Sequence, residues 1–215
     1  MRRIHNMNKS LLASLSAAAS LLALALPAHA ATVVDTGTPD GQAVNALFFD
    51  SNDWVDAQVS FASESTIDNI QGHILGGATG ETFDISLLAN DGRFGPGSVL
   101  YTTTATFGSD GWNGAALSGW NVAAGSYWVE FEIQGADTLG SSSVTGALLD
   151  LGAPNPVTNT VSTGDGGFTY QASPLSFGLR VDASVVSAVP EASSAALMLA
   201  GLAWLFAPAF VRRKR

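Results

Sequence analysis

Apolar and polar residues alternate one by one over long stretches of the chain after residue 32. Successive side chains of a β-strand point to opposite faces, so each alternating run predicts a strand with one buried face. The clearest runs cover residues 55–61, 83–89, 99–107, 127–133 and 175–181. Weaker runs cover residues 46–49, 67–75, 117–122, 144–149 and 168–171.

Short clusters of glycine, proline, asparagine and aspartate separate these runs, for example Asn90-Asp91-Gly92 and Gly164-Asp165-Gly166-Gly167. Such residues supply positive φ angles or fixed turns. No long helical period appears between the two ends of the chain. About ten short strands with frequent turns predict an all-β fold, an antiparallel β-sandwich of jelly-roll type.

Residues 1–30 have the three-part organisation of a secretory signal peptide. A basic start precedes a run rich in leucine and alanine, and Ala28 and Ala30 form an A-x-A cleavage site. We therefore expect export through the secretion translocon and cleavage by signal peptidase before Ala31. A retained N-terminal anchor is the alternative, but serines interrupt the apolar run.

The other end of the chain carries an apolar run at residues 195–211. As a helix, its 17 residues would be about 25 Å long, near the lower limit for spanning a bilayer. We expect a transmembrane helix whose basic flank stays in the cytoplasm, so that the preceding domain faces outward. The small residues 183–188 are expected to be a linker after a folded domain at 31–182. The basic stop-transfer residues are Arg212, Arg213, Lys214 and Arg215.

A short motif, Val189-Pro190-Glu191-Ala192, stands just before this run. The order of motif, apolar helix and terminal basic residues resembles the PEP-CTERM sorting signal of Gram-negative bacteria, which the membrane enzyme exosortase processes. The family motif usually has a second proline where this chain has Ala192. The resemblance implies an inner-membrane protein that processing transfers to the cell surface or outside. An ordinary single-span anchor that is never cut is the alternative.

Charge is distributed very unevenly along the chain. Seven of the nine basic residues lie in the two terminal segments, so residues 31–188 have only Arg93 and Arg180 against 17 acidic residues. Nucleic-acid binding depends on cationic neutralisation of phosphates, so a nucleic-acid partner is excluded. The chain has no cysteine, which excludes disulfides and thiolate metal sites.

The candidates for catalysis are few. His73 is the only histidine after residue 30, and the chain has no G-x-S-x-G motif, so we expect a structural or surface histidine. Glu130 and Glu132 are two residues apart on one strand, about 7 Å, which is near the carboxylate separation of an inverting glycosidase. Neighbours on one strand point in parallel, however, so we expect them to form a solvent-exposed acidic face.

Two sets of residues are candidates for binding. Trp54 and Trp128 are predicted to point outward, where indole rings can stack on sugars, although they could instead pack under loops. The loop oxygen donors are suited to calcium, but no EF-hand pattern is present and the same residues commonly form turns. These donors are Asp50, Asn52, Asp53 and Asp91.

These observations favour an exported, noncatalytic protein of the cell surface or extracellular matrix. Its domain would act in biofilm or polysaccharide contacts, without a cofactor unless calcium is bound. A secreted polysaccharide hydrolase that uses acidic residues is one alternative. A folded carrier of sugars attached to its serine and threonine side chains is another.

Overall fold

The computed structural model describes residues 30–39, 46–92, 95–142, 146–174 and 176–186. Every regular element in these ranges is a β-strand. No helix in this part of the chain is long and apolar enough to cross a membrane. Most of the expected signal peptide, the sorting motif 189–192, the helix 195–211 and the basic residues 212–215 lie outside the described residues.

The described strands form two antiparallel sheets of six strands each, named here after a central strand. The β4 sheet has the order β1 (Ala31–Asp35), β12 (Leu179–Val185), β4 (Ser65–Leu75), β9 (Ala147–Asp150) and β2 (Ala46–Phe49), and β7 (Gly111–Val122) also pairs with β4. The β8 sheet has the order β11 (Gln171–Ala172), β10 (Thr160–Thr163), β3 (Trp54–Phe61), β8 (Gly125–Glu132), β5 (Thr82–Asn90) and β6 (Pro96–Thr106).

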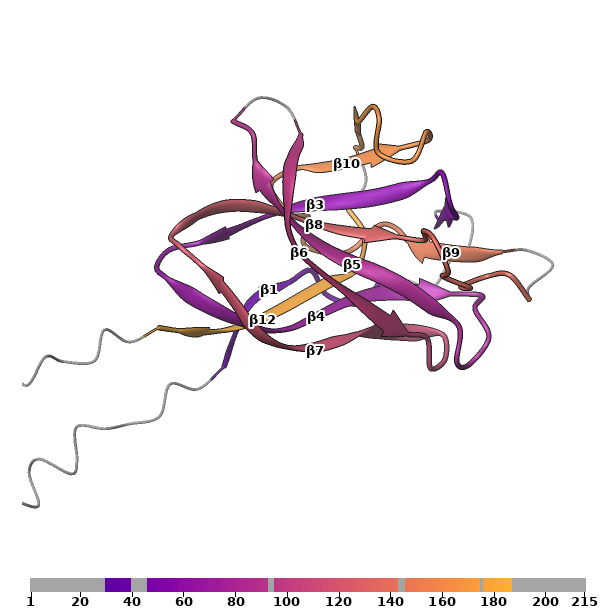
Figure 1. The fold of residues 1–215 in the computed structure, drawn as a ribbon, viewed down its shortest axis with the longest axis horizontal. Coiled ribbons are helices and arrows are strands. Elements are labelled where there is room, and N and C mark those ends of the chain that lie inside the picture. Colours follow the sequence, from indigo (N-terminus) through magenta and orange to yellow (C-terminus); the bar gives the residue numbers. More distant parts are fainter. Residues whose placement is uncertain (1–29, 40–45, 93–94, 143–145, 175, 187–215) are drawn as a thin grey trace, which may run out of the picture.

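The two sheets form two layers with the hydrophobic core between them (Figure 1). Alternate side chains of β3, β5 and β8 enter this core. The ring of Phe131 stacks on Phe83 at 6.3 Å and meets Phe177 edge-on at 5.6 Å. Gly72 on β4 leaves room for Phe131, because a Cβ atom there would lie 2.8 Å from its ring. The predicted all-β, antiparallel, two-sheet architecture is confirmed.

Most strands lie where the alternation predicted them, and the differences have physical causes. β7 begins at Gly111, well before the expected residue 117, because its glycine-rich first half has no apolar alternation. Gly114 is required there, since a Cβ atom would lie 1.9 Å from the carbonyl oxygen of Ile70. At the other end, β12 starts at Leu179, four residues later than predicted.

The last strand also extends into the segment that was expected to be a linker. Ala183, Ser184 and Val185 continue β12 and pair with β4. Backbone pairing does not depend on side-chain size, so small residues gave no sign of it in the sequence. β12 also pairs with β1, with Ala31 opposite Ala183, and the two strands lie side by side at one edge of the β4 sheet (Figure 1).

Candidate functional site

A row of polar side chains crosses the face of the β8 sheet that points away from the core. In this row Asp56 on β3 pairs with Glu130 on β8, which pairs in turn with Ser86 on β5. Two residues further along the same strands, Glu132 on β8 pairs with Asp84 on β5. Each of these residues alternates with a core residue, so strand geometry alone places them together on the outer face.

Three acidic residues of this row are buried, which corrects the expectation of a solvent-exposed face at Glu130 and Glu132. The exposed fractions are 0% for Asp56, 1% for Glu130 and 3% for Glu132. We call these three residues the carboxyl cluster. Nearby on the same outer face, Tyr170 packs against a small second core formed by Leu88, Trp128 and Val161.

This second core explains why the sequence did not show that Glu130 and Glu132 are buried. Val161 on β10 lies opposite Asp56 and shares its outer face, and Tyr170, from the chain that leads into β11, packs against this face. Period-two alternation separates the two faces of a strand, but it cannot show whether another segment covers the polar one.

The carboxyl cluster is held by a few hydrogen bonds. The Tyr170 hydroxyl donates to Oε2 of Glu130 at 2.8 Å, and the Ser86 hydroxyl donates to Oε1 of Glu132 at 2.5 Å. Asp56 lies opposite Glu130 on the neighbouring strand, and neither of its carboxyl oxygens has a hydrogen-bond partner among the described residues.

Burial makes the cluster hard to ionise. It raises the pKa of Asp56 well above the usual range, and the negative charge of Glu130 raises it further. For Glu132, burial raises the pKa to about 7, with the charges of Glu130, Asp84 and Asp137 adding to the effect and the Ser86 bond opposing it. Burial also raises the pKa of Tyr170, so its hydroxyl stays protonated as a donor.

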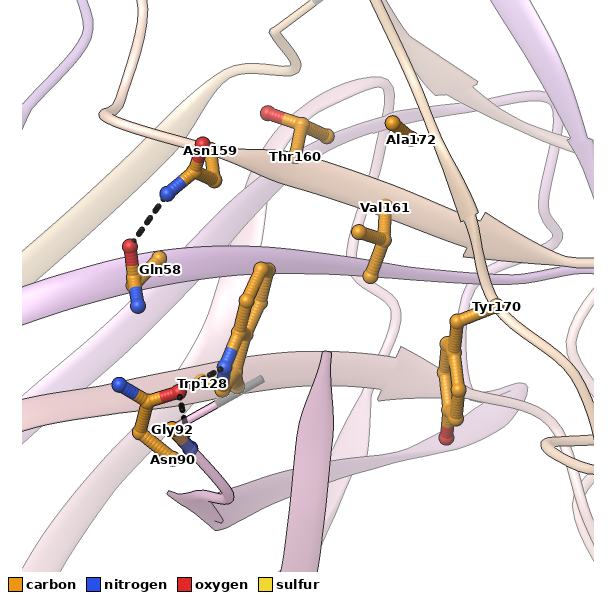
Figure 2. Close-up of a pocket in the computed structure, with 9 residues that line it drawn as sticks. All are labelled: Gln58, Asn90, Gly92, Trp128, Asn159, Thr160, Val161, Tyr170 and Ala172. Carbon is orange, nitrogen blue, oxygen red and sulfur yellow. Dashed lines mark hydrogen bonds between the residues drawn. The ribbon is translucent and has the colours of Figure 1, made fainter. Parts of the chain in front are cut away.

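A pocket of about 450 Å³ opens beside Tyr170, the residue that bonds to Glu130 (Figure 2). The indole N–H of Trp128 donates to Oδ1 of Asn90 at 3.3 Å, and the Asn159 amide donates to Oε1 of Gln58 at 2.6 Å. Figure 2 shows the rings of Trp128 and Tyr170 standing apart from each other below β10. The lining residues are Gln58, Asn90, Gly92, Trp128, Asn159, Thr160, Val161, Tyr170 and Ala172.

The two tryptophans proposed for sugar binding have different surroundings. Trp128 lies on the outer face and lines the pocket, but only 2% of it is exposed, so most of its ring surface is already covered by protein. Trp54 does not line this pocket. Its ring lies under Gly167, where a Cβ atom would come within 2.7 Å of it.

Sequence reasoning missed most of the pocket. Gln58 could have been found, because it alternates with core residues on β3 and pairs with Trp128. Tyr170 falls in the weak run at residues 168–171, but that run does not show that its ring packs against the outer face of the β8 sheet. Asn159 lies in irregular chain before β10, where no periodic pattern places it.

The proposed calcium ligands form turns in the described structure. Oδ1 of Asp50 accepts hydrogen bonds from the backbone N–H groups of Asn52, at 2.7 Å, and Asp53, at 3.1 Å. Asp91 follows β5 in a different loop. Within the described ranges, no three histidine, cysteine, aspartate or glutamate side chains are grouped to hold a metal ion.

His73 lies on the opposite side of the molecule from the pocket, in the β4 sheet. It is buried, its Nδ1 is 3.1 Å from Oδ2 of Asp150, and its ring meets Trp112 edge-on. The guanidinium of Arg180 lies over the ring of Trp112, with its Cζ atom 3.9 Å from the ring centroid. These contacts connect β4, β7, β9 and β12, which is a structural role.

No protein-family model matches the chain, and no curated protein sequence does. One similar solved structure is that of the cysteine protease and lectin-like domains of Cwp84, a surface layer associated protein of Clostridium difficile. It is 9% identical over 63% of this chain, with a TM-score of 0.46, and the match spans about a third of that protein, 32%. A similarity of this degree assigns neither a fold family nor a ligand.

Proposed function

We propose that this domain is a noncatalytic carbohydrate-binding domain of an exported cell-surface or matrix protein, and that the pocket beside Tyr170 is its sugar site. The observation that carries the proposal is the pocket itself. Its volume of about 450 Å³ suits a small ligand, and it combines aromatic and apolar walls with the amide groups of Gln58, Asn90 and Asn159. Amides both donate and accept hydrogen bonds, as sugar hydroxyl groups do.

The same geometry disfavours the alternative of a polysaccharide hydrolase. A glycosidase needs two carboxyl groups that touch the substrate on either side of the bond to be cleaved. Asp56, Glu130 and Glu132 do not line the pocket, and Glu130 is already bonded to Tyr170. The proposed activity is therefore binding without turnover.

The test is a panel of soluble polysaccharides with a variant that fills the pocket. Ala172 is exposed and lines the pocket, so Ala172→Trp should reduce glycan affinity at least tenfold. Ala116→Trp, at an exposed position on β7 in the other sheet, is the matched control and should bind as the unmodified protein does. Failure to bind any glycan, or release of shorter products, would contradict the proposal.

For localisation, we propose that residues 189–215 are a sorting signal that exosortase cleaves at the inner membrane. The resemblance of the motif and the following segment to the PEP-CTERM signal supports it. The intact mass and cell fraction of the protein should be compared in cells with and without exosortase activity. In cells with active exosortase we expect a surface form that starts at Ala31 and lacks residues 195–211. An uncut inner-membrane protein in both strains would contradict the proposal.

We also propose that the two sheets form a sandwich of jelly-roll type.

A further inference from the structure

Phe168 lies in the loop between β10 and β11, with its side chain almost entirely in solvent. Its exposed fraction is 88%, and none of the other large apolar side chains that the structure describes is more exposed. A ring in this position adds little to the stability of the core, because it buries almost no apolar surface on folding. Single exposed apolar residues are common, so what distinguishes Phe168 is where the loop holds it.

The loop around Phe168 is fixed by hydrogen bonds to Asp165. Oδ1 of Asp165 accepts from the hydroxyl of Thr163 at 2.7 Å and from the backbone N–H of Thr169 at 2.8 Å. Oδ2 accepts from the hydroxyl of Thr169 at 2.6 Å. The backbone N–H of Gly167 donates to Oγ1 of Thr163 at 3.1 Å. The residues on both sides of Phe168 are therefore held in place, so a ligand that contacts the ring does not have to order the loop.

The same loop packs against the wall of the pocket. A Cβ atom on Gly167 would lie 2.7 Å from the ring of Trp54 and 3.3 Å from the hydroxyl oxygen of Tyr170. Tyr170 lines the pocket (Figure 2). Two residues of chain span at most about 7 Å, so the Cα atoms of Phe168 and Tyr170 are no further apart than this.

We propose that Phe168 is a second aromatic contact of the sugar site, and that the domain binds a stretch of several sugars along a polysaccharide chain. This inference rests on the proposed sugar site and adds the class of its ligand. A glycan chain that leaves the pocket past Tyr170 meets the exposed ring, and the apolar face of a sugar can stack on it. Phe168 thus supplies stacking surface that Trp128, which is 2% exposed, does not.

The test compares short and long members of three series: mannobiose with mannohexaose, cellobiose with cellohexaose, and chitobiose with chitohexaose. In at least one series the hexasaccharide should bind about tenfold more tightly than the disaccharide, because only the longer chain contacts the pocket and Phe168 together. Phe168→Ala should remove most of this difference and leave the affinity for the disaccharide unchanged. The ring is exposed, so this variant should keep the melting temperature of the unmodified protein.

Further variants separate ring stacking from a general loss of apolar surface. Phe168→Trp keeps an aromatic face and should retain the preference for the hexasaccharide, whereas Phe168→Leu should lose most of it. Phe48→Ala is the matched control and should bind as the unmodified protein does, because Phe48 is an exposed phenylalanine on β2 in the other sheet.

Two results would overturn this inference and leave the sugar site standing, provided that Ala172→Trp loses binding. One is equal affinity of the unmodified protein for the disaccharide and the hexasaccharide. The other is an unchanged affinity of Phe168→Ala for the hexasaccharide. Binding of no member of any series would overturn both the inference and the proposed sugar site.

Discussion

Glu132 shows how one residue can set the stability of this domain. It is a glutamate on a polar strand face, yet it is buried beside two other carboxyl groups and bonded to Ser86. Burial of this kind favours the protonated form. The folded state therefore holds a proton that the unfolded state releases over part of the physiological pH range.

Glu132→Gln should change how the stability of the domain depends on pH. The pKa of Glu132 rises from an ordinary 4.5 to about 7 on folding, so the folded state binds more protons between these values. Stability should fall as pH rises from 4.5 to 7 and change little from this group above 7. The variant lacks this loss, so its melting temperature relative to the unmodified protein should be higher at pH 8 than at pH 5.

Melts of the unmodified protein and of Glu64→Gln provide the comparison. Glu64 is an exposed glutamate in the turn between β3 and β4. Its replacement removes the same charge at an exposed position, away from the carboxyl cluster. Parallel curves for Glu132→Gln and the unmodified protein would show that Glu132 ionises normally in the folded state.

At the scale of elements, the sequence predicted the positions of the strands better than it predicted which residues pack against their outer faces. A strand with one apolar face, such as β3 or β8, shows its alternation directly in the sequence. Contacts on the outer face are made by Val161, in a strand that the alternation missed, and by Tyr170, whose short run at residues 168–171 does not show what the ring packs against. The core of the sandwich was therefore predictable, while most of the pocket and the burial of the carboxyl cluster were not.

The pairing of β7 with β4 gives a prediction at this scale. Gly114→Ala would place a methyl group against the backbone of Ile70, so we expect it to destabilise the fold by about 3 kcal/mol in urea denaturation. Gly108→Ala is the control, because its nearest neighbour would be 3.8 Å away. Equal stability of the two variants would mean that β7 does not approach β4 this closely.

The whole molecule is dominated by negative charge. Residues 31–188 contain 17 acidic residues and two arginines, so repulsion acts across the entire domain. Self-repulsion of this kind opposes the compact state, and salt reduces it. The effect belongs to no single residue.

Comparing the effects of NaCl and CaCl₂ on the melting temperature distinguishes general charge screening from binding at a calcium site. We expect the melting temperature to rise from 20 to 300 mM NaCl, as screening increases. If Asp50, Asp53 and Asp91 serve only in turns, CaCl₂ and NaCl at equal ionic strength should raise it equally. A larger rise with CaCl₂ would reveal a specific cation site, and Asp50→Asn would then be expected to remove it.

The pairing of the first and last described strands has a mechanical consequence. β1 begins opposite the last part of β12, with Ala31 across from Ala183, so chain entering and leaving the domain does so at one edge. Tension between these two ends would separate β1 from β12 one hydrogen bond at a time, which requires little force. Tension between the end of β12 and a glycan held beside Tyr170 would instead cross from one sheet to the other through the packed core. A domain tethered at that end alone would thus bear load along its stronger direction.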